Sequence, residues 1–365
     1  MRIAYLTNHI GQTGVNQVIR DLVHVMTSNG HECRVFFLKK VERPVSFDCD
    51  VLQLDGVNEL DGYDVIHVHG IWPELFVCRW RLHTMFQVSS LMLKKKRSVK
   101  SGKVHERPKL VTTLHCYCFQ DFFDLYGRLK GFMLGVLYLA TKLPFDKVVC
   151  LSQNMVNYYR GYISQQKLMY AYNTRIIDGH IPELSEEEQR EIYNFKGHRT
   201  LIGMSCVLLY RKGIDVMLKA MTLLPEEFRL FIAGDGKERK AFEQMASELG
   251  VSHRVLFAGM KKDAYRYLPY YDIYALPSRS EGFPISLLEA AACGCKVVAS
   301  RLPAVEECFT EEEIAKFDMP DEKALADAIL RAEANAELGG KLNRSFEEKY
   351  SPEVFYRKYL EIYSS

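Results

Sequence analysis

The sequence predicts an α/β protein made of two open, doubly wound parallel sheets. Short apolar strands alternate with helical patterns, and this alternation restarts midway along the chain. The chain has 365 residues, which is enough for two domains of ordinary size. A hydrophobic content of 48% and an aromatic content of 12% indicate a well-cored globular protein rather than a disordered one.

The first half, residues 1–175, is expected to form one sheet and its covering helices. The predicted strands are Arg2–Thr7, Glu32–Leu38, Val65–Val68, Lys109–Leu114, Lys147–Leu151 and Lys167–Tyr172. Helical patterns occupy Val15–Ser28, roughly Pro73–Leu93, Tyr126–Leu143 and Asn154–Tyr159. Strands that alternate with helices in this way are typical of a parallel sheet.

The second half, residues 176–351, repeats the architecture without repeating the sequence. Its predicted strands are Leu201–Met204, Arg229–Ala233, Val255–Phe257, Ile273–Leu276 and Lys296–Ala299. Its predicted helices are Ile214–Leu223, Glu238–Leu249, Pro284–Cys293, Glu322–Ala334 and Gly340–Tyr350. Pro352 then opens a last amphipathic helix, Glu353–Tyr363.

Residues 271–300 carry the most chemical information, because two glutamates stand eight positions apart around a predicted helix start. Glu281 lies in the loop before Pro284, and Glu289 lies in the apolar helix that follows. A buried carboxylate costs several kcal/mol unless hydrogen-bond donors surround it. Ligands of parallel sheets bind at the carboxyl ends of the strands, where helix amides suit an anion and carboxylates accept from hydroxyls. Phosphate plus sugar is the implied ligand class; a structural salt bridge is the alternative.

The flanks of this pair resemble a known motif. Glu-Gly-Phe-Pro begins at the first acid, and Ala-x-Gly-x-x-Val-Val-Ala-Ser follows the second. The stretch resembles the E-x7-E motif of the retaining glycosyltransferases of the GT-B fold, glycosyltransferase family 4 (group 1). The resemblance implies two facing Rossmann-like domains with an interdomain cleft. Residues 1–175 are then the acceptor domain, 176–351 the nucleotide-sugar donor domain, and helix 352–365 crosses back to the first.

The resemblance also implies roles for residues. Glu289 would hold the ribose hydroxyls of the donor and Glu281 the sugar hydroxyls, while Lys212 and the loop amides would neutralise the departing diphosphate. The amides belong to Gly282, Phe283, Pro284, Ile285 and Ser286, of which the proline offers no N–H. The scheme requires no metal and no other cofactor; the nucleotide sugar, UDP- or GDP-linked, is a co-substrate. Attack from the same face would retain the anomeric configuration, without a confidently placed carboxylate nucleophile.

Three glycine turns after predicted strands are further candidates for donor contacts. They hold Gly14 in Gly11-Gln12-Thr13-Gly14, Gly234 in Ala233-Gly234-Asp235-Gly236, and Gly259 followed by Met260. Glycine permits close backbone approach to a ligand, and a simple strand-to-helix turn is the alternative. The resemblance implies the functional role, because the family has a glycine-rich first loop and glycine turns near its donor.

Histidines mark the acceptor side. His115 ends a predicted strand, and it matches the strand-end histidine that sits beside the reacting centre in the family. His69 and His67 lie two apart on another strand, so both side chains point to one face. For His69 an acceptor contact and a structural hydrogen bond are both open, and for His67 the structural role is favoured.

One departure from the family concerns the diphosphate clamp. The family usually places an arginine five or six residues before the lysine, but here Cys206 and Val207 occupy those positions relative to Lys212. Arg211 is the nearest replacement, although adjacent side chains need not face the same way. A charged contact to the leaving group that nothing replaced would cost on the order of 2–4 kcal/mol.

The cysteines and the apolar runs indicate the cellular compartment to expect. The ten cysteines are scattered, show no C-x2-C pair and fit reduced thiols in a cytoplasmic protein. The first strand is too short for a signal peptide, and the most apolar stretch, Gly131–Thr141, is too short to span a bilayer.

A basic segment, Arg79–Lys109, has ten Lys/Arg against one acid, and its run Lys94–Lys109 follows an aromatic-rich helix. This pattern suits the anionic inner face of a plasma membrane, and a solvated loop is the alternative. Nucleic acid is not expected, because no recognition motif accompanies the charge. We therefore predict a transferase of cell-surface polysaccharide synthesis with a glycan or lipid-linked acceptor. A non-catalytic nucleotide-sugar-binding protein and a GT-B epimerase are the alternatives.

Overall fold

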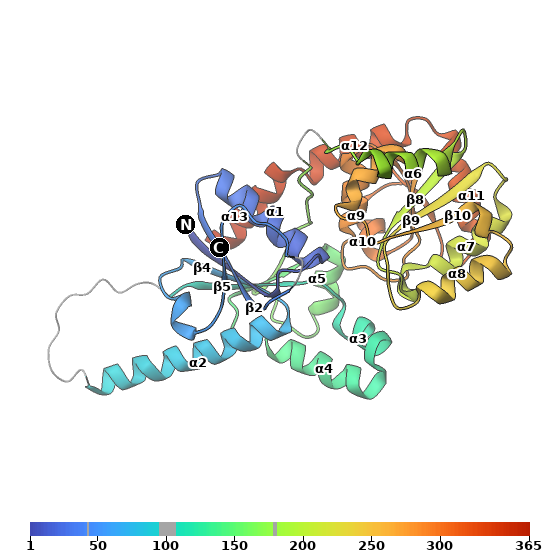
Figure 1. The fold of residues 1–365 in the computed structure, drawn as a ribbon. Coiled ribbons are helices and arrows are strands. Elements are labelled where there is room, and N and C mark those ends of the chain that lie inside the picture. The colour runs from blue at the N-terminus through green and yellow to red at the C-terminus, as the bar shows by residue number, and fades with distance from the viewer. Residues whose placement is uncertain (42–43, 95–106, 178–180) are drawn as a thin grey trace. The chain divides into compact units, whose positions relative to one another are not determined.

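The structure, a computed structural model, describes residues 1–41, 44–94, 107–177 and 181–365 (Figure 1). It divides into two compact units. Unit 1 comprises Met1–Asn173 and Pro352–Ser365, and unit 2 comprises Thr174–Ser351. The sequence had suggested a boundary after residue 175 and a last helix that returns to the first domain.

Unit 1 is built on a parallel sheet with the strand order β3-β2-β1-β4-β5-β6-β7 in the described residues. The strands are β1 (Arg2–His9), β2 (Glu32–Lys39), β3 (Asp50–Gln53), β4 (Val65–His69), β5 (Lys109–Leu114), β6 (Lys147–Cys150) and β7 (Leu168–Tyr170). The chain moves outward from β1 in one direction and then returns to continue in the other. The carboxyl ends of β1 and β4 therefore form the switch point at which doubly wound sheets bind ligands.

The helices of unit 1 are α1 (Gly14–Ser28), α2 (Ile71–Lys94), α3 (Cys118–Tyr126), α4 (Arg128–Ala140), α5 (Gln153–Tyr159) and α13 (Pro352–Ser364). The single helix predicted over Tyr126–Leu143 is wrong at its start, because Gly127 has φ 76° and separates α3 from α4. The strand β3 was missed, since four residues with alternating exposure carry little pattern.

Unit 2 repeats this plan with the strand order β10-β9-β8-β11-β12-β13. The strands are β8 (Thr200–Ser205), β9 (Phe228–Ala233), β10 (Val255–Gly259), β11 (Ile273–Leu276), β12 (Lys296–Ser300) and β13 (Ala315–Phe317). The helices are α6 (Glu186–Lys196), α7 (Ile214–Leu223), α8 (Arg239–Glu248), α9 (Ile285–Ala292), α10 (Pro303–Cys308), α11 (Glu322–Ala334) and α12 (Leu338–Lys349). Here the switch point lies between β8 and β11, so their carboxyl ends are neighbours.

The predicted α/β class with two doubly wound parallel sheets is confirmed for each unit. Central strands such as β4, β9 and β11 are buried along their whole length, because helices cover both faces of the sheets. The elements α6, α10 and β13 were not predicted. The helix α6 begins with a capping box between Ser185 and Glu188, which its acidic composition had obscured.

The last helix, α13, is fixed to unit 1 by polar contacts. Tyr356 Oη lies 3.2 Å from His31 Nε2, and Lys109 Nζ donates to the Tyr363 carbonyl over 3.0 Å. Tyr363 Oη also meets the buried His67 Nδ1 at 2.7 Å. Across the described ranges, none of the helices combines the length and apolar character that crossing a bilayer requires.

Candidate active site

The loop after β11 carries the first glutamate, and buried hydroxyls hold this loop in place. Glu281 Oε1 accepts from Lys212 Nζ at 2.5 Å and from Ser278 Oγ at 2.8 Å. The carbonyl of Ser278, in turn, accepts from Ser300 Oγ at 2.6 Å. The carboxylate of Glu281 is therefore oriented by residues from three neighbouring strand ends, β8, β11 and β12.

Lys212 reaches this loop because glycine follows it. It lies in a 3-10 turn, Tyr210–Lys212, directly ahead of α7, whose bounds agree with the predicted helix. Gly213 has φ 69°, and a Cβ atom there would collide with the carbonyl oxygen of Pro277. Only glycine lets the turn approach the end of β11 so closely.

Two arginines complete a cationic cluster around the loop. Arg211 Nη1 donates to the Ser280 carbonyl over 3.2 Å, so Arg211 and Lys212 both turn towards residues 278–281. Arg279 binds both oxygens of Asp215 at 2.8 and 2.7 Å and stacks over the Tyr210 ring at 3.7 Å. This bidentate pair anchors the loop to the first turn of α7. The sequence had not indicated it.

Cys206 stands where the family usually has an arginine. Burial raises the pKa of its thiol to about 12; Lys212 lowers this pKa and Glu281 raises it. The thiol is therefore neutral near pH 7 and contributes no positive charge to the cluster.

The helix α9 begins without a side-chain cap. Pro284 is its N-cap residue and provides no side-chain hydrogen bond to the first turn. The first N–H groups of an uncapped helix and its dipole together make a site for an anion. The start of α9 follows directly on the loop that carries Glu281.

Arg175 is the hydrogen-bond donor that the partly buried carboxylate of Glu289 requires. The sequence analysis did not predict this partner. Arg175 Nε donates to Glu289 Oε1 over 2.8 Å, with 1% and 15% of the two side chains exposed. Thr174 Oγ1 donates to the Tyr350 carbonyl over 2.6 Å and so fixes the segment that presents Arg175. The two members of the pair are 114 positions apart, and no local pattern links them.

The glycine turns of unit 2 have structural reasons of their own. The amide of Gly234 donates to the carbonyl of Gly259 over 2.8 Å, which joins the ends of β9 and β10. A Cβ atom on Gly234 would collide with the carbonyl oxygen of Cys206. Met260, the next residue after β10, is exposed.

In unit 1, the first loop is organised by Asn16. This buried side chain donates to the carbonyls of His9 and Gly11, each at 2.7 Å, and accepts from Thr7 Oγ1 at 3.0 Å. Gly14 begins α1 and is exposed. Asn16 was not singled out from the sequence, because an asparagine in the first turn of a helix has no distinctive spacing.

The structure brings two predicted histidines of unit 1 together. His69 Nδ1 and His115 Nε2 are 3.0 Å apart at the carboxyl ends of β4 and β5. Burial, together with a smaller effect of the Lys142 charge, lowers the pKa of His115 to about 4. Burial also lowers the pKa of His69. Both rings are therefore neutral near pH 7. His67 bonds Tyr363 and Thr113, as expected of a structural histidine.

A buried ion pair lies near these histidines and was not predicted. Lys142 Nζ donates to Glu74, and both side chains are almost fully buried. The remaining acceptor capacity of Glu74 is used by Thr112 Oγ1 at 2.5 Å and Thr141 Oγ1 at 2.7 Å. The pair connects the start of α2 to the segment after α4.

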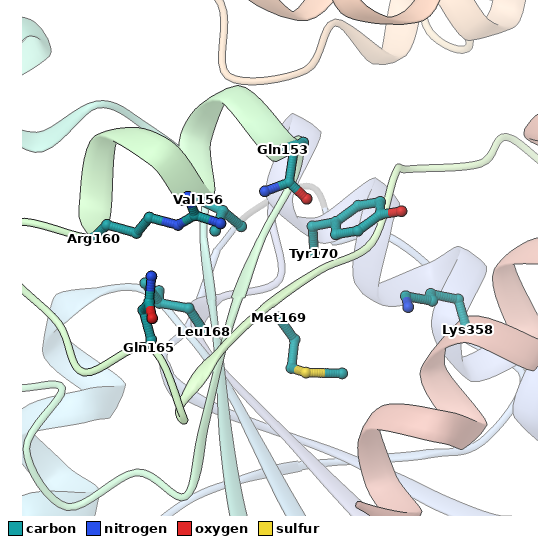
Figure 2. Close-up of a pocket in the computed structure, with 8 residues that line it drawn as sticks. All are labelled: Gln153, Val156, Arg160, Gln165, Leu168, Met169, Tyr170 and Lys358. Carbon is teal, nitrogen blue, oxygen red and sulfur yellow. The ribbon is translucent and has the colours of Figure 1, made fainter.

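An open pocket of about 330 Å³ lies elsewhere on unit 1, among α5, β7 and α13 (Figure 2). Figure 2 shows Arg160 and Lys358 on opposite sides of Tyr170. None of the predicted site residues lines this pocket.

The basic segment is only partly described. Residues 95–106, which include Lys95, Lys96 and Arg97, lie outside the described residues. At its end, Lys109 Nζ donates to the carbonyls of Tyr363 and Ser365 at 3.0 and 2.5 Å. This lysine therefore holds the carboxyl terminus in place.

Comparison with known proteins identifies the second unit. Residues 185–349 match the family "Glycosyl transferases group 1". Residues 185–349 therefore resemble a group 1 glycosyltransferase domain. The match covers the loop of Glu281, the cationic cluster and α9, and it confirms the resemblance to group 1 glycosyltransferases that the E-x7-E stretch indicated.

Relatives extend this similarity to the whole chain. The O-antigen biosynthesis glycosyltransferase WclY of Escherichia coli is 28% identical over 375 residues, covering 100% of this chain and 98% of WclY. The lipopolysaccharide core biosynthesis glycosyltransferase LpsE of Rhizobium meliloti is 28% identical over 228 residues, covering 54% of this chain and 67% of LpsE.

Solved structures show the same fold. Anabaena HepE in complex with UDP and glucose has a TM-score of 0.77 at 15% identity, with 100% of this chain and 99% of HepE covered. Sucrose-phosphate synthase of Thermosynechococcus elongatus has a TM-score of 0.79 at 19% identity, with 100% and 98% covered. At this level of identity, the similarity establishes the architecture, which is that of GT-B glycosyltransferases.

Proposed function

We propose that the protein is a retaining glycosyltransferase of cell-surface polysaccharide synthesis, which moves a sugar from a UDP- or GDP-linked donor to a glycan or lipid-linked acceptor. The observation that carries the proposal is the meeting of Lys212, Arg211 and the uncapped start of α9 around Glu281. The similarity to the O-antigen biosynthesis glycosyltransferase WclY, which covers 98% of WclY, supports a glycan or lipid-linked acceptor.

The two glutamates take different parts in donor binding. An ion partner is expected for each glutamate both in a structural salt bridge and in a donor site. The ion pairs alone therefore do not distinguish these two interpretations. The functional interpretation is favoured by the cluster of cations beside the uncapped start of α9. This cluster supplies more positive charge than pairing with one loop glutamate requires. Glu281 is proposed to hold the sugar hydroxyls, and Glu289, oriented by Arg175, the ribose hydroxyls.

The diphosphate would be neutralised by cations and amides instead of a metal. Lys212 is paired with Glu281, and an incoming diphosphate would share its ammonium group. Arg211 takes over the charge that Cys206 cannot supply, since its guanidinium already faces the same loop. Such contacts act mostly on the leaving group, where negative charge develops in the transition state.

The transfer breaks the bond between the anomeric carbon and the phosphate oxygen and forms a bond to an acceptor hydroxyl oxygen on the same face. The acceptor proton leaves with the nucleoside diphosphate. His115 is proposed to serve the acceptor side, with His69 orienting its ring. A neutral imidazole donates one hydrogen bond to a sugar hydroxyl without adding charge.

The acceptor is proposed to be at the inner face of the plasma membrane, with the protein cytoplasmic and peripheral. The cationic composition of Arg79–Lys109 supports contact with anionic lipid, at about 1 kcal/mol per basic residue near the surface.

A donor panel tests the function. The purified chain is incubated with UDP- and GDP-sugars, and transfer, hydrolysis and epimerisation are followed by NMR, which also reports the anomeric configuration. Glu289→Ala should weaken nucleotide binding, whereas Glu281→Ala should mainly reduce turnover. Glu348→Ala, which removes an exposed acid of α12, is the matched control and should match wild type. Near-wild-type activity in both site variants would refute the site, and epimerised donor would refute transferase activity.

A further inference from the structure

The helix α4 has an outward face made almost entirely of apolar side chains. Its exposed apolar residues recur at helical spacing over Leu129, Phe132, Met133, Val136, Leu137 and Ala140. The exposed fractions of Leu129, Met133 and Phe132 are 78%, 64% and 55%. A surface helix of a globular protein normally directs such a stripe towards the core and shows polar residues to water. In α4 this arrangement is inverted.

The inward face explains how the inversion arises. Gly131 and Gly135 face α3, where a Cβ atom would collide with the Phe122 carbonyl and the Phe119 ring. These glycines let α3 and α4 lie close together, so the small residues make the internal contact. Of the large side chains of α4, Tyr138 is buried against Phe122 and Phe132 stacks on the Phe119 ring, whereas the other apolar residues of the outward face stay exposed.

The apolar face continues beyond α4. Leu125 and Tyr126 at the end of α3 are 58% and 48% exposed, and Leu143 after α4 is 76% exposed. We call these three residues together with Leu129, Phe132, Met133, Val136 and Leu137 the α3–α4 surface. Figure 1 shows α3 and α4 next to each other at the edge of unit 1. Contiguous apolar patches of this kind mark interaction sites on soluble proteins.

The charges at the rim indicate the partner. The helix α4 contains no acidic residue, and its exposed cations are Arg128 and Lys130. Lys130 Nζ lies 5.3 Å from the centroid of the Tyr126 ring, at the margin of the apolar face. Asp124 is an exposed acid of α3, so the rim as a whole is weakly cationic. Apolar side chains flanked by cations and a tyrosine suit the interface of an anionic bilayer.

We propose that the α3–α4 surface docks on an anionic lipid bilayer. Leu129, Phe132 and Met133 enter the boundary between headgroups and acyl chains, while Arg128 and Lys130 contact the phosphates. A second copy of the chain fits less well, because α4 offers no carboxylate to neutralise these cations. The proposal rests on the membrane association proposed above and assigns a surface to it, but it does not depend on sugar transfer, since vesicle binding needs neither donor nor acceptor.

Vesicle sedimentation tests the surface. The full chain is mixed with phosphatidylcholine vesicles with and without phosphatidylglycerol, alongside the variant Leu129→Ser/Phe132→Ser/Met133→Ser. We expect the wild type to bind the anionic vesicles and the triple variant to lose about tenfold or more in affinity. The matched control Leu223→Ser/Leu330→Ser removes two exposed leucines of unit 2, 52% and 38% exposed, and should bind as wild type. Unchanged melting temperature and nucleotide binding show that the triple variant is folded.

Fluorescence quenching provides a test that does not rely on loss of binding. In Phe132→Trp, lipids with brominated acyl chains should quench the added tryptophan, but not that in Leu223→Trp; the native tryptophan signal is subtracted. Part of the binding should also persist in high salt, because acyl insertion is not screened. Equal vesicle binding by wild type and triple variant, absence of binding by wild type, or no quenching at position 132 would overturn the proposal. A dimer that the triple variant abolishes would assign the surface to a second copy instead.

Discussion

Arg175 offers a sharp test of the donor site, because its guanidinium is buried and was invisible in the sequence. Arg175→Ala leaves the carboxylate of Glu289, 15% exposed, without this cation. Removing one partner of a buried ion pair typically costs 3–5 kcal/mol, and the partial exposure of Glu289 places the expected loss at about 3 kcal/mol. We expect the free energy of unfolding to fall by this amount, because the segment around α9 is held less firmly.

The same substitution should weaken nucleotide binding. Glu289 would no longer be held in position, and a hydrogen bond to a charged group contributes about 1.5–3 kcal/mol, which corresponds to roughly 10- to 150-fold in the dissociation constant. Isothermal titration calorimetry with UDP or GDP, as selected by the donor panel, measures this change. Arg344→Ala, which removes an exposed arginine of α12, is the matched control and should leave the affinity unchanged.

A double-mutant cycle separates positioning from direct contact. If Arg175 acts on the nucleotide through Glu289, then Arg175→Ala/Glu289→Ala should bind the nucleotide no worse than Glu289→Ala alone. Strictly additive losses would mean that Arg175 contacts the ligand itself. Wild-type affinity in Arg175→Ala would refute the assignment of Glu289 to the ribose hydroxyls.

Three further predictions concern charge, metal and backbone. Burial lowers the pKa of His67 to about 3 and that of His115 to about 4, so the unfolded chain binds protons that the native chain does not. The free energy of unfolding should therefore fall as the pH drops from 7 to 5, by about 2 kcal/mol per histidine at pH 5. His115→Gln should make this fall smaller when it is measured by chemical unfolding. A stability that is level across this range would contradict the burial argument. Transferase activity should survive EDTA, and its loss with recovery on adding Mn²⁺ or Mg²⁺ would show that cations and amides do not replace a metal. Gly213→Ala should destabilise the protein by about 2 kcal/mol or more, whereas Gly250→Ala, with φ 72° and open space around it, should show the backbone strain alone; equal effects would remove the collision with Pro277 from the account.

The sequence by itself determined the class of fold and the neighbourhood of the site. Apolar runs such as Ile273–Leu276 and Lys109–Leu114 were predicted with the bounds that the structure has, because strand periodicity and flanking turns are local properties. The strands β3 and β13 were not predicted, since β3 has no buried residue and β13 has three residues with a lysine at its centre. The break between α3 and α4 at Gly127 was not predicted, because apolar residues continue on both sides of it.

The tertiary structure alone decided which side chains meet. Lys212 and Glu281 are 69 positions apart, yet they touch because β8 and β11 are neighbours at the switch point of the sheet. Arg175 and Glu289 meet across 114 positions. Neither pair leaves a trace in local periodicity, because strand order is set by how the whole set of helices and strands packs. The outward apolar face of α4 was likewise decided there: its sequence is apolar throughout, and only the packing of Gly131 and Gly135 on α3 determines which side faces water.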